Sequence, residues 1–150
     1  MEVRGLRQHI VLATKYTTDY KRGKPGQHST FVGNNTKSMH NSVTDSLKKL
    51  RTEYIDILYV HWWDYTSSVE EVMDALHNLV VQGKVLYLGI SDAPAWVVVE
   101  ANAYARYNGK TPFVIYQGQW SIMERDLERD ILPMCVKQGT SVRSASQPES

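Results

Sequence analysis

The sequence has a single cysteine, no excess of charge and no long apolar run. Cys135 alone rules out an internal disulfide and a cysteine-based metal cluster, and it is compatible with a reducing compartment, so we expect a cytoplasmic protein. Lys and Arg number 17 against 16 Asp and Glu, a formal charge of +1. Such a balance gives no field that would attract nucleic acid or a membrane surface, and we expect neither as a partner.

Three further signatures are missing. The apolar run IVLA near the N-terminus is far shorter than the core of a signal peptide or a membrane-spanning helix. None of the histidines pairs with another ligand at helical spacing in a familiar motif, so no metal site is expected. No G-x-G-x-x-G motif opens a helix, which disfavours a Rossmann-type dinucleotide site.

What the sequence does have is a strand whose character changes abruptly at its end. In EYIDILYVHWWDY, residues 55–60 are almost continuously apolar, as in a parallel strand covered on both faces. His61, Trp62, Trp63 and Asp64 follow at once. Polar residues that arrive where a strand stops are the first sign of a site.

Strands and helices alternate along the whole chain. Strands are predicted at 10–14, 55–60, 84–90 and 113–116, with helices at 38–50, from Ser67 or Ser68 to Gly83, at 96–107 and at 127–137. This order is typical of a parallel sheet with helical crossovers, either open and doubly wound or part of a barrel, and the even spacing after a long first loop favours the barrel. We predict an α/β fold, a partial (β/α)8 TIM barrel of about four central βα units over residues 1–139, with a disordered polar tail at 140–150.

Each predicted strand ends in a polar residue: Lys15, His61, Ser91 with Asp92, and Gln117. Because parallel strands end on one side of the sheet, these side chains are expected to converge on a common rim, where barrels bind their ligands. Each residue alone also has a structural interpretation. The lysine could be a solvated charge, the histidine a packed one, and Asp92 a helix cap before Pro94.

The segments IVLATK, DILYVHWWD, GKVLYLGISD and YQGQWS resemble the aldo-keto reductase superfamily, most closely its fungal aryl-alcohol dehydrogenase and norsolorinic acid reductase branch. The likeness runs from about Ile10 to Gln138. It implies a (β/α)8 barrel that uses NADP(H) to reduce aryl aldehydes or ketones, or to oxidise the alcohols. It also implies a catalytic set of Asp, Tyr, Lys and His in which the tyrosine donates a proton to the carbonyl.

By this resemblance Lys15 matches the catalytic lysine, which lowers the pKa of the tyrosine, and His61 the histidine that orients the carbonyl. A cationic amine beside a phenol does favour the phenolate, and a neutral imidazole can donate to an oxygen that gains negative charge.

The resemblance also assigns binding residues. Ser91, Asp92 and Gln117 match positions that hold the nicotinamide carboxamide, although the family more commonly has asparagine in place of Asp92. Trp62 matches an aromatic residue of the substrate pocket, where it would form a flat apolar wall.

The sequence departs from the family pattern at both ends. The family's aspartate and tyrosine precede the lysine strand and are absent here, and after Gly139 the expected apolar strand is replaced by TSVRSASQPES. We therefore expect a truncated or misread gene product that lacks turnover on its own. Neither Tyr16, which should point away from Lys15, nor Tyr65 is an evident replacement. The alternative is a non-catalytic half-barrel that pairs with itself or with a full-length relative through open sheet edges.

Overall fold

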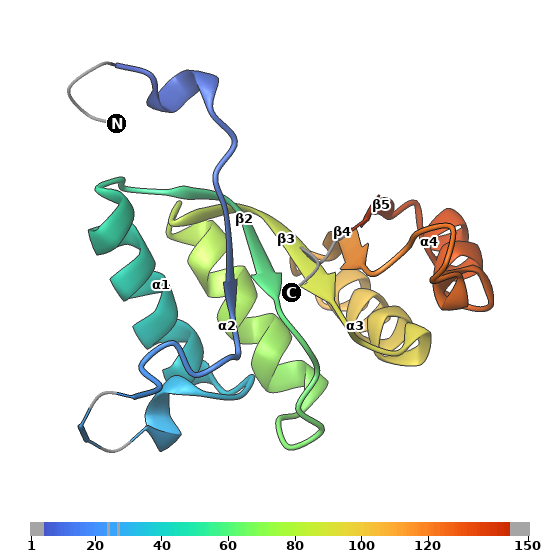
Figure 1. Cartoon of the computed structure of the whole chain (residues 1–150), viewed down its shortest axis with the longest axis horizontal. Coiled ribbons are helices and arrows are strands. Elements are labelled where there is room, and N and C mark those ends of the chain that lie inside the picture. Colours follow the sequence, from blue (N-terminus) through green and yellow to red (C-terminus); the bar gives the residue numbers. More distant parts are fainter. Residues whose placement is uncertain (1–4, 24, 27, 145–150) are drawn as a thin grey trace.

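The fold is one curved layer of parallel strands (Figure 1). The computed structural model describes residues 5–23, 25–26 and 28–144. Within these residues, five strands lie in chain order, β1-β2-β3-β4-β5. They are β1 (Ala13–Tyr16), β2 (Ile55–Val60), β3 (Val85–Ser91), β4 (Phe113–Gly118) and β5 (Ser141–Ser144). Sequential parallel order is that of a barrel wall, so the predicted α/β class and partial barrel are confirmed.

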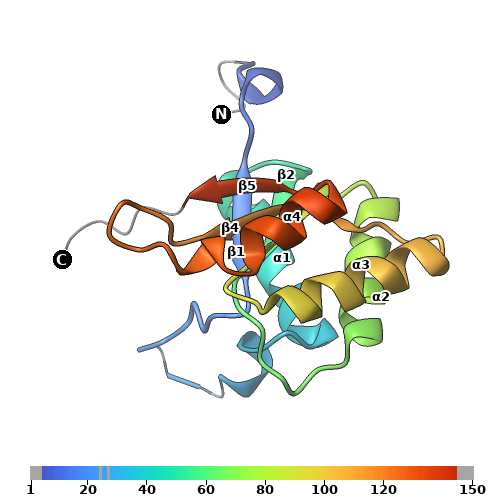
Figure 2. The same cartoon turned by 90° about the vertical axis from the view of Figure 1, so that its right-hand side faces the viewer.

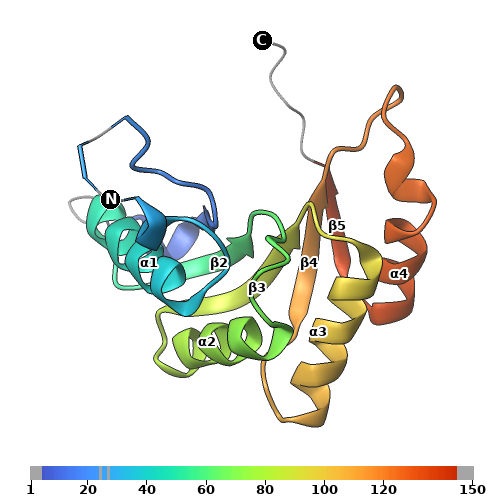
Figure 3. The same cartoon turned by 90° about the horizontal axis from the view of Figure 1, so that it is seen from below.

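The helices follow one side of this layer (Figure 3). They are α1 (Thr36–Leu50), α2 (Val69–Val81), α3 (Ala95–Tyr107) and α4 (Ile131–Gln138). Short 3-10 turns lie before β1 (η2, Arg7–His9), between β1 and α1 (η3, Ser29–Phe31) and between β4 and α4 (η4, Asp126–Glu128). None of the helices in the described part of the chain combines the length and apolar character needed to cross a bilayer.

The core lies between the sheet and these helices. Leu58, Val60, Leu88 and Ile90 are at most 1% exposed. Tyr16 is buried as well, whereas its neighbour Lys15 is exposed, so the two side chains point to opposite faces as predicted. The other face of the sheet is the open face, and Lys15 lies on it.

Both edges of the sheet differ from the sequence prediction. At one edge, β1 begins at Ala13 rather than Ile10. Before it, the Leu12 carbonyl accepts from the N–H groups of both Asp56 and Ile57, outside the regular ladder.

At the other edge, residues 141–144 form β5 beside α4 (Figure 2), so the expectation of a disordered tail is wrong for them; residues 145–150 lie outside the described residues. Val142 packs against the core, but the other side chains of β5 are exposed. Backbone pairing with β4 holds β5 in place. Because this pairing does not depend on apolar side chains, the sequence of β5 has no strand pattern that would predict it.

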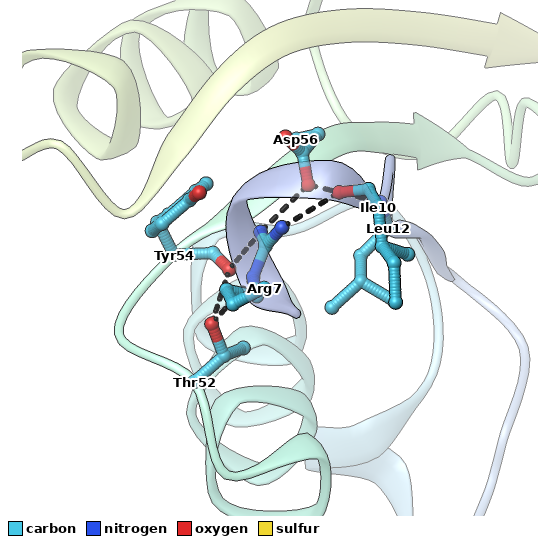
Figure 4. A network of polar contacts seen from close by, with 6 residues as sticks. All are labelled: Arg7, Ile10, Leu12, Thr52, Tyr54 and Asp56. Atoms are coloured by element: carbon cyan, nitrogen blue, oxygen red, sulfur yellow. Dashed lines mark hydrogen bonds and ion pairs between the residues drawn. The ribbon is translucent and has the colours of Figure 1, made fainter. Parts of the chain in front are cut away.

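Arg7 fastens the N-terminal segment to the start of β2 (Figure 4). Its guanidinium lies 2.6 Å from the Asp56 carboxylate and also donates to Thr52 Oγ1 and to the carbonyls of Ile10 and Tyr54. The same Asp56 oxygen accepts from the N–H of Leu12. A planar fork of donors suits this arrangement, which closes the end of the sheet opposite the predicted site.

Candidate active site

Strand register places the predicted residues on one face and at one end of the sheet. Lys15 pairs with Tyr59, two residues before His61, and Ser91 pairs directly with Gln117. Since Tyr59 in turn pairs with Gly89, two residues before Ser91, all four side chains belong to the open face. The parallel arrangement therefore collects them at the carboxyl ends of the strands.

Lys15 and His61 line the same cavity, which has a volume of about 170 Å³. Burial lowers the pKa of His61, and the charge of Lys15 lowers it further against a weaker opposing effect of Asp92. Both effects favour the neutral form of His61, which can donate one N–H and accept at the other ring nitrogen.

Ser91 and Gln117 stand side by side on β3 and β4. Ser91 is 2% exposed and Gln117 is half-buried. Within the described residues, neither side chain makes a hydrogen bond, so a hydroxyl and a primary amide remain available to a ligand.

Asp92 lies apart from this pair. Its φ of 41° turns the chain sharply after β3, and it lines a separate hollow of about 470 Å³ with Tyr65 and Pro94. The structural alternative for Asp92 is wrong, because the N-cap of α3 is Pro94 and no side chain caps this helix.

Trp62 and Trp63 differ in burial and in role. Trp63 is 6% exposed and packs in the core. Trp62 is half-buried, and its indole N–H donates to Thr18 Oγ1 at 3.2 Å. Thr18 also contacts His61 Nδ1 at 3.0 Å, a connection that the sequence did not indicate.

A buried polar clamp holds the loops that carry these residues. Asn34, fully buried, donates through Nδ2 to Thr17 Oγ1 and to the Trp62 carbonyl, and its Oδ1 accepts from the N–H of Asp64. The Asp64 carboxylate accepts from the N–H of Asn34 in return. Thr17 has a φ of 106°, an unfavourable conformation for a β-branched residue that this clamp maintains.

A model of the aldo/keto reductase family matches residues 2–147, nearly the whole chain and beyond Gly139, where we had expected the likeness to stop. The chain belongs to the aldo/keto reductase family.

Several curated family members are similar in sequence. An aryl-alcohol dehydrogenase (NADP(+)) of Phanerodontia chrysosporium is 63% identical over 146 residues, which cover 95% of this chain and 38% of the relative. Norsolorinic acid reductase of Aspergillus flavus is 59% identical over 140 residues, covering 93% of this chain and 36% of the relative. An aryl-alcohol dehydrogenase of Pestalotiopsis microspora is 55% identical over 91% of this chain and 36% of the relative. The chain thus spans little more than a third of the length of these relatives.

One local arrangement contains all four residue types of the catalytic set that the resemblance implies. Tyr20 and Asp45 line the same cavity as Lys15 and His61. However, Tyr20 donates its hydroxyl to Asp45 at 2.8 Å, and burial together with this carboxylate raises the pKa of Tyr20 well above its ordinary value. A proton donor needs the opposite shift, so the electrostatics disfavour Tyr20 as a replacement for the family tyrosine.

Proposed function

We propose that this chain supplies the lysine, histidine and nicotinamide-binding side of an NADP(H)-dependent oxidoreductase. The substrates are aryl aldehydes and ketones, or in the reverse direction the corresponding alcohols. The observation that carries the proposal is that Lys15 and His61 line one cavity, which α1 also borders, and that strand register puts them at the same end of the sheet as the Ser91–Gln117 pair. The names of the similar proteins support the substrate class and the cofactor.

The polar groups present fit the carboxamide of nicotinamide. A carboxamide offers one acceptor and two donors, and the free Ser91 hydroxyl and Gln117 amide can each donate and accept. We assign these two residues to holding the ring, with Asp92 at the margin of the site. When bound, the nicotinamide supplies hydride chemistry, and the protein's part is to orient the ring face towards the carbonyl.

Lys15 and His61 then act on the carbonyl oxygen and on the proton donor. Neutral His61 donates an N–H to the oxygen as negative charge develops on it. The ammonium of Lys15 favours the phenolate form of a tyrosine placed beside it and so makes that phenol a better acid. Trp62 forms an apolar wall against the aromatic part of the substrate.

The proposal does not assign a proton donor, because no tyrosine or aspartate precedes Lys15 in the given sequence. We expect the 150-residue chain to show no turnover alone. A chimera tests the site itself: residues 2–139 replace the matching segment of the Phanerodontia chrysosporium enzyme, and oxidation of NADPH is followed with benzaldehyde.

The chimera should be active, and its Lys15→Met variant should lose about 100-fold or more in kcat. Lys37→Met, a change at an exposed residue of α1, is the matched control and should leave kcat unchanged. An active chimera that tolerates Lys15→Met would refute the proposal, and turnover by the 150-residue chain would refute the missing-donor argument.

A further inference from the structure

The side chains of Thr18, His61 and Trp62 form a short hydrogen-bonded chain. Thr18 Oγ1 lies 3.2 Å from Trp62 Nε1 and 3.0 Å from His61 Nδ1. The indole N–H can only donate, so the Thr18 oxygen accepts from Trp62. The single hydroxyl hydrogen of Thr18 then has one protein acceptor in the described part of the chain, His61 Nδ1.

We propose that Thr18 is a positioning residue that holds His61 in the tautomer with its hydrogen on Nε2. In the other tautomer, Nδ1–H would donate to Thr18, and the hydroxyl hydrogen of the exposed Thr18 would have only solvent as its acceptor besides the described residues, so the bond to His61 Nδ1 would be lost. Which ring nitrogen carries the proton is set by the hydrogen bond at the other one. Hydrogen bonds in such a chain also strengthen one another.

The backbone that carries Thr18, His61 and Trp62 is held in place by hydrogen bonds other than those between their side chains. The N–H of His61 donates to the carbonyl of Tyr16 at 3.1 Å, which joins the ends of β1 and β2. The buried Asn34 ties Thr17 to the Trp62 carbonyl. Both sides of the Thr18 contact are therefore anchored, and the hydroxyl meets the imidazole without an added cost of ordering either loop.

The assignment determines which ring group of His61 remains for a ligand. With Nδ1 engaged by Thr18, the remaining ring donor is Nε2–H, which is the group that a carbonyl oxygen requires. This role in catalysis rests on the proposed function, whereas the tautomer itself does not. Thr18 would thus link the residue assigned to the substrate wall, Trp62, to the residue assigned to the carbonyl.

The test is the tautomer of His61, read from long-range 1H–15N correlations of the 15N-labelled 150-residue chain above the pKa of His61. A His61→Gln variant assigns the signals. The wild type and Thr18→Ser should show the Nε2–H form with Nδ1 unprotonated. Thr18→Val should lose this preference at least several-fold, while Thr44→Val, a change at an exposed threonine of α1, should keep it.

An Nδ1–H tautomer in the wild type, or an unchanged tautomer in folded Thr18→Val, would overturn the proposal. If Thr18→Val does not fold, Trp62→Phe serves instead. It frees the Thr18 oxygen to accept from Nδ1–H and should weaken the preference for Nε2–H, and an unchanged preference would count against the chain of bonds.

Turnover separates this inference from the proposed function. In an active chimera, Thr18→Val should lower kcat by about tenfold with little change in KM, and Thr18→Ser should restore it. An inactive chimera together with the expected tautomer would reject the proposed function and retain the hydrogen-bond assignment.

Discussion

Single side chains fix the loops that carry the candidate site, and Asp64 is the clearest case. Burial alone would raise the pKa of the Asp64 carboxyl, but hydrogen bonds from the N–H groups of Asn34, Thr66 and Ser67 hold it below its usual range. The carboxylate thereby joins the loop before α1 to the turn after β2. The positions of His61 and Trp62 depend on this junction.

Acid should loosen the junction. Because the folded-state pKa of Asp64 lies below its unfolded value, its contribution to stability is present above the ordinary carboxyl pKa and is lost as pH falls through the folded value. Asp64→Asn should lower the free energy of unfolding at pH 7 by about 1–3 kcal/mol. The variant should also lose less stability than the wild type when the pH is lowered. Urea unfolding at pH 7 and at an acidic pH measures both effects. Asp126→Asn, at a largely exposed carboxylate, is the control. Equal effects of the two changes would contradict this account.

Gly89 makes room for a tyrosine ring on the open face. A Cβ at Gly89 would lie 2.5 Å from the Tyr59 ring, and Tyr59 is buried although it lies on that face. The ammonium of Lys15 is 5.9 Å from the centroid of the same ring. Tyr59 therefore forms part of the buried surface of the open face next to Lys15.

Gly89→Ala should therefore destabilise the protein by about 1–3 kcal/mol. In a Tyr59→Leu background the same change should cost less, because the closest contact is removed, while the contact of the new Cβ with Ile115 Cγ2 at 2.9 Å remains. Thermal unfolding of the four proteins in this double-mutant cycle gives the coupling. A cost of Gly89→Ala that is the same in both backgrounds would show that the ring is not the obstacle.

The sequence was informative about residues at strand ends and silent about their neighbours. The positions of Lys15, His61, Ser91 and Gln117 followed from strand direction alone, and their roles stay predictions. Thr18 and Asn34 could not be predicted, because their contacts depend on how a long loop closes against a turn more than 25 residues away. The contact of Tyr59 with Gly89 could not be predicted either, because Tyr59 lies within a continuous apolar run.

Among the helices and strands, capping shows how neighbouring units are joined. The sequence allowed a capping box at Ser67 or Ser68, and the structure uses Ser68, whose hydroxyl accepts from the N–H of Glu71. Glu71 does not return the bond to its own helix. Its carboxylate instead accepts from the N–H and hydroxyl of Thr36, at the first turn of α1. A carboxylate there suits the positive end of the helix dipole.

Removing each cap should therefore affect a different helix. Glu71→Ala should speed amide exchange in the first turn of α1, and Ser68→Ala should do so in the first turn of α2 at a cost of about 1 kcal/mol. Hydrogen exchange followed by mass spectrometry distinguishes the two, and each variant is the control for the other. Faster exchange confined to α2 in Glu71→Ala would argue against the link between the units.

Across the whole molecule, the sheet ends in two edges. In the described residues, β1 pairs only with β2 and β5 only with β4. Unpaired strand edges favour further pairing, so self-association through them stays our prediction for this chain. The fold class could be predicted because alternating strands and helices allow few architectures, whereas β5 could not, since backbone pairing leaves no mark on side-chain pattern.

Sedimentation of the 150-residue chain tests this prediction. We expect the weight-average mass to rise with protein concentration. Val142→Pro removes one backbone N–H from β5 and should lower the stability of this edge strand, and with it the rise of mass with concentration. A monomer at all concentrations that melts cooperatively would be evidence against association through the edges.

The central claim is that separate strands bring their polar ends into one site, and the electrostatic effect of Lys15 on His61 tests it most directly. The positive charge of Lys15 lowers the pKa of His61, in addition to the larger effect of burial. An NMR titration of His61 in the 150-residue chain should therefore give a higher pKa in Lys15→Met than in the wild type, with Lys37→Met unchanged. A His61 pKa that does not respond to Lys15→Met would show that the two residues do not share a site.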